Sequence, residues 1–142
     1  MNNITRQSTS DEEFLYLLGL CQWVFNSNFN FIIEMIDKEH HNKSDERWNL
    51  LIEFTAGKLL GYKNKILTIL GQDIYELFDE LIDERNAIIH SIPTGEKVDN
   101  YVIPIYRNDS KKAYIRIDKK YLRNFIEKNQ RLTDLIYEIR GY

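Results

Sequence analysis

The chain has 142 residues, of which 43% are hydrophobic and 29% are charged, with a formal net charge of −3. This length is typical of a single domain and is enough to bury a core without disulfides or metals as staples. The hydrophobic and aromatic content excludes wholesale disorder, and the acidic balance excludes a generally basic nucleic-acid coat. The single cysteine, Cys21, excludes an intrachain disulfide. We therefore expect one domain over residues 1–142, in the reducing cytoplasm.

Neither a targeting segment nor a membrane span is expected. Residues 1–10 are polar and lack the apolar run of a signal peptide. Every apolar stretch is interrupted well before the roughly 20 residues that a transmembrane helix requires.

Apolar residues at spacings of three and four predict four long helices. Ser10, followed by Glu13 three residues later, predicts a capping box at the start of the first helix. Pro93 predicts the end of the third, and Asp118 predicts the N-cap of the fourth. The predicted helices cover about 11–40, 46–70, 72–91 and 118–140.

A different pattern precedes the last helix. Residues 101–106 and 113–117 are rich in β-branched and aromatic side chains and flank a turn-like Asn108-Asp109-Ser110, which predicts a β-hairpin over about 100–117. Pro104 has no N–H to donate, so we expect its strand at the edge of the sheet. The predicted fold is mainly all-α: an up-and-down bundle of about four long helices, with the hairpin inserted before the last.

Charge is concentrated in residues 107–131, which hold nine basic and three acidic side chains, whereas the rest of the chain is acidic. Tyr106, Tyr114 and Tyr121 lie in or beside this segment and could stack bases while the cations bind phosphates. The alternative is an ordinary solvated surface of the hairpin and helix. The candidate RNA-binding residues are Lys111, Lys112, Arg116, Lys119, Lys120 and Arg123.

Arg85 interrupts the apolar stripe of the third predicted helix. An unpaired charge in such a place is costly, so it indicates either a functional group or a buried ion pair. The ion-pair interpretation requires an acid from another helix, such as Glu34 or Glu53. His90, in the last turn before Pro93, is of the residue type best suited to acid–base catalysis near neutral pH.

Arg85, Asn86 and His90 together form an R-x4-H pattern in its RN-xxx-H variant. This pattern resembles the signature of the HEPN superfamily, the higher eukaryote and prokaryote nucleotide-binding domains. These are small all-helical domains, and many are metal-independent ribonucleases of toxin–antitoxin, phage-defence and CRISPR systems. The resemblance covers residues 83–91 closely and the helical layout loosely. Two features depart from the family pattern: Ile92 stands where some HEPN toxins carry a tyrosine, and the inserted hairpin is absent from the minimal domain.

The resemblance implies a role for each residue of the motif. Arg85 would bind or polarise the scissile phosphate, His90 would act as general acid or base, and Asn86 would orient the site. RNA would be cleaved through the ribose 2′-hydroxyl, with no metal and no cofactor. Glu39, His40 and His41 are consecutive and could bind a metal, but no further His or Cys completes the set of ligands that a metal site needs.

One chain offers one histidine in this motif, although cleavage requires both a base and an acid. On an ideal helix, Arg85 and His90 are about 140° apart. They converge only if the helix unwinds near His90 or if two chains meet across an axis. HEPN domains typically dimerise, so the resemblance implies a homodimer with a composite cleft.

Three functional hypotheses follow. The first is an HEPN-like endoribonuclease acting as a toxin or anti-phage effector, with an antitoxin or regulatory protein as a possible partner. The second is a catalytically silent HEPN module that binds RNA, a nucleotide or a protein. The third is a helical interaction protein in which Arg85 forms a structural ion pair.

Overall fold

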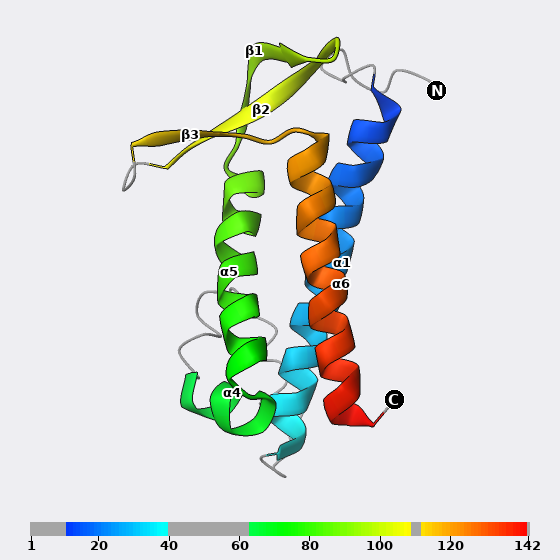
Figure 1. The fold of residues 1–142 in the computed structure, drawn as a ribbon, viewed down its shortest axis with the longest axis vertical. Coiled ribbons are helices and arrows are strands. Elements are labelled where there is room, and N and C mark those ends of the chain that lie inside the picture. The colour runs from blue at the N-terminus through cyan, green and yellow to red at the C-terminus, as the bar shows by residue number, and fades with distance from the viewer. Residues whose placement is uncertain (1–10, 40–62, 109–111, 142) are drawn as a thin grey trace.

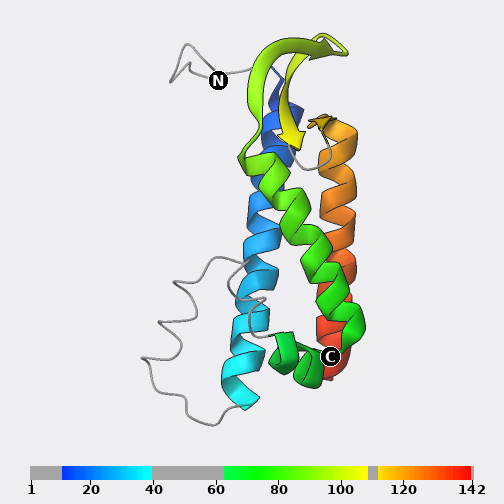
Figure 2. The same cartoon turned by 90° about the vertical axis from the view of Figure 1, so that its left-hand side faces the viewer.

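The computed structural model describes residues 11–39, 63–108 and 112–141. Its helices there are α1 (Glu12–Glu39), α4 (Lys63–Leu70), α5 (Gln72–Ile89) and α6 (Lys119–Arg140). The long helices α1, α5 and α6 run side by side, and the short α4 lies across the end at which α5 begins (Figures 1 and 2). The predicted first, third and fourth helices are confirmed to within two residues. Of the predicted second helix, only the part from 63 to 70 lies within the described residues.

The start of each long terminal helix is fixed by an aspartate. Asp118 accepts a hydrogen bond from the backbone N–H of Tyr121 at 2.8 Å, which confirms it as the N-cap of α6. At α1, Asp11 accepts from the N–H of Phe14 at 2.8 Å. Asp11 therefore caps α1, and the prediction that Ser10 would do so was wrong by one residue. Aspartate and serine are equally good N-caps, so adjacent candidates are not distinguished by residue type.

An antiparallel sheet of three strands covers one end of the helices, beyond the end of α5 and the start of α6 (Figure 1). Its strands are β1 (Ile92–Val98), β2 (Tyr101–Asn108) and β3 (Ala113–Arg116), in the order β1-β2-β3. The predicted hairpin corresponds to β2 and β3. The first strand was not predicted, because most of its residues are exposed and it contains both proline and glycine.

A two-residue turn joins β1 to β2. Asp99 and Asn100 have positive φ angles of 49° and 68° between the paired residues Val98 and Tyr101. Positive φ at both central positions is the mark of a type I′ hairpin turn, and Asp and Asn tolerate it better than most residues. This turn is the sequence signal from which β1 could have been inferred.

The prediction of an edge position for Pro104 was wrong, since β2 is the central strand. The Pro104 carbonyl accepts a hydrogen bond from the N–H of Ile117 at 3.0 Å, just beyond the last residue of β3. The N and O of one residue face the same side of a strand, so the proline nitrogen also points to the place where the β3 pairing ends. Toward β1, Pro104 stands opposite Pro93. The central strand thus tolerates proline because the missing N–H falls where the ladder with β3 stops.

The core is centred on three phenylalanines, one from each long helix. The Phe25 ring centroid lies 6.1 Å from those of Phe78 and Phe125, and all three side chains are buried. The sheet closes this core through Ile103 of β2, which is also fully buried. None of the helices within the described ranges is both long enough and apolar enough to cross a membrane.

Beside this apolar core, α1 and α6 are joined by buried polar groups. The Asn28 side-chain amide donates to the carbonyl of Asn129 at 2.9 Å and to its Oδ1 at 3.1 Å. The Thr133 hydroxyl donates to Oδ1 of Asn28 at 2.8 Å. Because these bonds form only at one alignment, they fix how α1 and α6 are set against each other.

Candidate functional site

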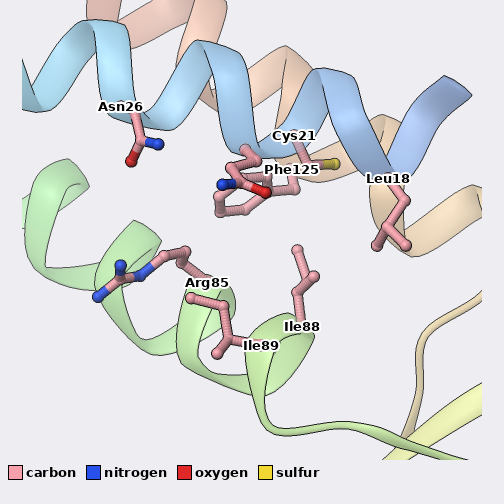
Figure 3. A pocket seen from close by; sticks show the side chains of 8 residues that line it. Leu18, Cys21, Asn26, Arg85, Ile88, Ile89 and Phe125 are labelled. Atoms are coloured by element: carbon pink, nitrogen blue, oxygen red, sulfur yellow. The ribbon is translucent and has the colours of Figure 1, made fainter.

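Arg85 lies at a cavity of about 460 Å³ between α1, α5 and α6. Figure 3 shows Arg85, Ile88 and Ile89 of α5 on one side, with Leu18 and Asn26 of α1 on the other. The wall is mixed, because polar side chains join mainly apolar ones. The complete lining consists of Leu18, Cys21, Gln22, Asn26, Arg85, Ile88, Ile89 and Phe125. An apolar cavity with a few convergent polar groups is the usual form of a small-molecule or substrate site.

The Arg85 guanidinium is half-buried and has no acidic partner among the described residues. Its Cζ lies 4.9 Å from the centroid of the Phe25 ring, a cation–π contact. Its Nη2 donates to Oδ1 of Asn86 at 3.3 Å, and its Nε is buried without a hydrogen-bond partner among the residues that the structure describes. Burial lowers the pKa of Arg85 from its usual value, but an arginine remains charged in proteins. A guanidinium cation without a carboxylate partner among the described residues, placed at a cavity, is suited to bind an anion.

The structure does not support an ion pair between Arg85 and Glu34. Glu34 is instead close to Arg140, with Oε2 3.7 Å from Nη1, and accepts from the side chain of Asn30 at 3.2 Å. Glu53, the other suggested partner, lies outside the described residues. The position of Arg85 on the apolar stripe is confirmed, whereas the Glu34 pairing was wrong.

His90 is exposed and lies at the C-cap of α5, where its backbone N–H donates to the carbonyl of Asn86 at 3.0 Å. It does not line the Arg85 cavity. Because α5 remains helical through Ile89, unwinding does not bring His90 round to Arg85 within one chain. Asn86, four residues before His90, shares its face of the helix and contacts Arg85. Asn86 therefore lies between the other two residues of the motif.

A second cavity, of about 500 Å³, lies on the other side of α5, toward the sheet and α6. Asn86 belongs to its wall together with two acidic residues of α5 and two tyrosines, Tyr106 and Tyr121. The tyrosines were noted in the sequence as stacking candidates, but their convergence depends on the sheet and could not be predicted.

Half of the predicted RNA-binding residues are bonded to carboxylates. Arg116 is paired with Glu96, and Arg123 is paired with Glu13. Lys119 Nζ lies 2.9 Å from Asp11 Oδ2, and the hydrogen bond that it donates lowers the pKa of the Asp11 carboxyl. These cations are mostly neutralised by acids from distant parts of the chain.

The remaining three candidates differ. Lys112 and Lys120 are exposed and form no ion pair with any described residue. Lys111 lies outside the described residues, as do His40 and His41. The basic segment therefore offers less free charge than its composition suggests.

Cys21 is buried in the wall of the Arg85 cavity, as expected of a core residue. Burial raises the pKa of its thiol to about 12 from 9.0. The thiolate fraction at pH 8 is thus about a thousandfold below that of an unperturbed thiol, and the thiolate is the reactive form.

We expect iodoacetamide at pH 8 to alkylate Cys21 at least about a hundredfold more slowly in the native protein than in urea. Mass spectrometry of timed samples measures both rates. Because the chain has one cysteine, every modified molecule reports this position. Equal rates in the two conditions would contradict the burial of Cys21.

In the parts of the chain that the structure describes, no group of three or more His, Cys, Asp or Glu is placed to hold a metal ion. Comparison with protein-family models, with curated proteins and with solved structures gave no match. The functional argument therefore depends on the residues themselves.

Proposed function

We propose that the chain is an HEPN-like, metal-independent endoribonuclease that acts as a toxin or anti-phage effector in the cytoplasm. The observation that supports this proposal most is the Arg85 guanidinium, half-buried at a cavity without a carboxylate partner among the described residues. A protein rarely maintains an unpaired cation in such a place unless it binds an anion there. The phosphodiester of RNA is the anion that the R-x4-H motif implies.

In the proposed reaction, the ribose 2′-oxygen attacks the adjacent phosphorus while the bond from phosphorus to the 5′-oxygen breaks. A base removes the 2′-hydroxyl proton and an acid donates a proton to the leaving 5′-oxygen, so that a 2′,3′-cyclic phosphate and a 5′-hydroxyl result. Arg85 stabilises the charge that develops on the phosphate oxygens. Asn86 holds the guanidinium through its Oδ1, and His90 transfers a proton.

The proposal includes a homodimer and an up-and-down helical bundle as its fold. Arg85 and His90 lie on different faces of a continuous α5, so a second copy is the simplest source of a His90 near Arg85. Exposed apolar side chains at the end of α5 support an interface there, since Ile89 is 57% exposed and Ile92 64%.

A second candidate is a catalytically silent HEPN module that binds RNA, a nucleotide or a protein partner. The exposed position of His90, away from the Arg85 cavity, favours this alternative for a chain that acts alone. The two candidates differ in whether His90 affects cleavage.

To test the proposal, purified protein is incubated with RNA in EDTA, and the products are separated on denaturing gels. We expect cleavage by the wild type and a loss of about a hundredfold or more in His90→Ala, the usual range for removal of an acid–base group. Asp79→Ala, on an exposed part of α5, is the matched control and should cleave normally. RNA binding without cleavage would favour the silent module instead.

A mixing experiment tests the composite cleft. In a two-fold dimer in which Arg85 of each chain faces His90 of the other, a mixed dimer of Arg85→Ala and His90→Ala retains one such pair, whereas each variant alone retains none. We expect the mixture, after subunit exchange, to recover up to about a quarter of wild-type activity, since half of the dimers are mixed and each has one intact cleft. If activity does not return although native mass spectrometry shows mixed dimers, one Arg85 facing one His90 across the axis is not sufficient for cleavage.

A further inference from the structure

The second cavity combines stacking surfaces with hydrogen-bonding groups. Tyr106 of β2 and Tyr121 of α6 contribute aromatic rings, and Asp83 and Asn86 of α5 contribute polar groups. The Tyr121 hydroxyl donates to the carbonyl of Glu84 at 3.3 Å, which restrains its ring. The volume of about 500 Å³ is within the range of roughly 300–1,000 Å³ typical of small-molecule sites. Aromatic walls of this kind suit a planar ring such as a nucleobase.

The two acidic residues of this wall are not equivalent. The Glu84 carboxylate is bonded to Lys128, whose Nζ lies 2.7 Å from its Oε2. Asp83 is exposed and forms no ion pair within the described ranges. Asp83 thus leaves a carboxylate with two oxygens able to accept hydrogen bonds at this cavity.

Asn86 supplies the complementary donor. Its Oδ1 accepts from Arg85, while its Nδ2 has no partner among the described residues. Asp83 and Asn86 are three residues apart on α5, so their side chains are neighbours on one face. The cavity edge therefore presents an N–H donor beside a carboxylate acceptor.

We propose that this cavity binds a guanine base of the RNA, and that Asp83 and Asn86 read its Watson–Crick edge. Guanine presents an acceptor, O6, followed by two donors, N1–H and the N2 amino group. Asn86 Nδ2 donates to O6, and the Asp83 carboxylate accepts from N1–H and N2–H. Uracil would place its O2 carbonyl against the carboxylate, while adenine and cytosine reverse the order of donor and acceptor.

The position of the cavity relates the base to the cleavage chemistry, so this inference rests on the proposed function. Asn86 contacts the Arg85 guanidinium and shares a helix face with His90. A guanine held by Asn86 would place its own sugar and phosphate beside these two groups. The cavity would then select where the RNA is cut.

Mononucleotide binding tests the inference without any cleavage. Isothermal titration of the wild type should give a Kd for guanosine 5′-monophosphate at least about tenfold below that for uridine 5′-monophosphate. Asp83→Asn should reduce this ratio to about threefold or less, because it removes the charge that attracts both donors. Asp79→Asn, an exposed aspartate one turn earlier on α5, should leave the ratio unchanged. Inorganic phosphate alone shows how much of the binding comes from the anion.

A second pair of variants tests the aromatic wall. Tyr106→Leu should weaken guanosine monophosphate binding about tenfold, whereas Tyr16→Leu, 67% exposed on α1 and outside the cavity, should have little effect. Equal binding of the two nucleotides to the wild type would overturn the inference. Identical behaviour of Asp83→Asn and Asp79→Asn would do the same.

Cleavage mapping separates this inference from the proposed function. If RNA is cut without a preference for guanosine and the nucleotides bind equally, the guanine site fails while the ribonuclease proposal stands. If RNA is never cut but guanosine monophosphate binds in an Asp83-dependent way, the guanine site stands and the ribonuclease proposal fails.

Discussion

Replacing Arg85 with methionine is expected to abolish RNA cleavage without destabilising the protein. For activity, an arginine that stabilises the phosphoryl transition state commonly contributes a factor of roughly 10³–10⁵, so we expect a loss of at least about a thousandfold. Methionine has a similar length and a good helix propensity, but no charge with which to stabilise the phosphate. The effect should appear in the rate of cleavage at saturating RNA, measured in EDTA.

The stability half of this prediction follows from the surroundings of Arg85. Its Nε is buried without a hydrogen-bond partner in the described part of the chain, and burial opposes its charge, as the lowered pKa indicates. Methionine removes both penalties but loses the contact with the Phe25 ring. We expect the free energy of unfolding to change by about 0 to +1 kcal/mol, in contrast to the 3–5 kcal/mol lost when one partner of a buried ion pair is removed.

Arg131→Met is the matched control, because Arg131 is exposed on α6 away from both cavities. It should alter neither cleavage nor stability. Urea unfolding followed by circular dichroism measures the stability of all three proteins. If Arg85→Met lowers the free energy of unfolding by about 3 kcal/mol or more, Arg85 has a structural role, and the interpretation as a helical interaction protein is favoured.

The helices could be predicted because their signals are local. Apolar spacing and the cap at Asp118 gave bounds within two residues of those of α1, α5 and α6. The strand β1 has no such pattern, because it is held by backbone pairing with β2 and not by buried side chains. A central strand accepts Pro104 only because β3 ends opposite it. The end of β3 is a property of the neighbouring strand and cannot be predicted from the residues around the proline.

In the candidate site, too, the features with a local sequence signal could be predicted and those that depend on distant segments could not. Arg85 could be found because a charge on an apolar stripe is conspicuous in the sequence itself. That it has no acidic partner among the described residues became visible only in three dimensions. The ion pairs of the basic segment could not be predicted because its acidic partners are far away in sequence: Glu13 pairs with Arg123, 110 residues later. The cavity beside Asn86 was missed because its walls come from α5, two strands and α6.

The largest stability effect is expected at Asn28, where alanine should lower the free energy of unfolding by about 2–4 kcal/mol. The substitution removes both donations to Asn129 and the acceptor of the Thr133 hydroxyl. Thr133 keeps a second bond, to the carbonyl of Asn129 at 3.0 Å. The buried Oδ1 of Asn129 is left without that donor, and the space of the lost amide adds a cavity cost. Urea unfolding followed by circular dichroism measures the difference.

Asn30→Ala is the control for this prediction, since Asn30 is exposed on α1 and, within the described ranges, its side chain bonds only to Glu34 one turn later. Its effect should be within about 0.5 kcal/mol. The double variant Asn28→Ala with Asn129→Ala should lose less free energy of unfolding than the two single variants together, by about 1 kcal/mol or more. The reason is that each single substitution already breaks the side-chain hydrogen bond that the two residues share. Additive losses would mean that the two side chains stabilise the protein independently. The alignment of α1 with α6 would then depend on their other contacts, such as the apolar core around Phe25 and the ion pair of Glu13 with Arg123.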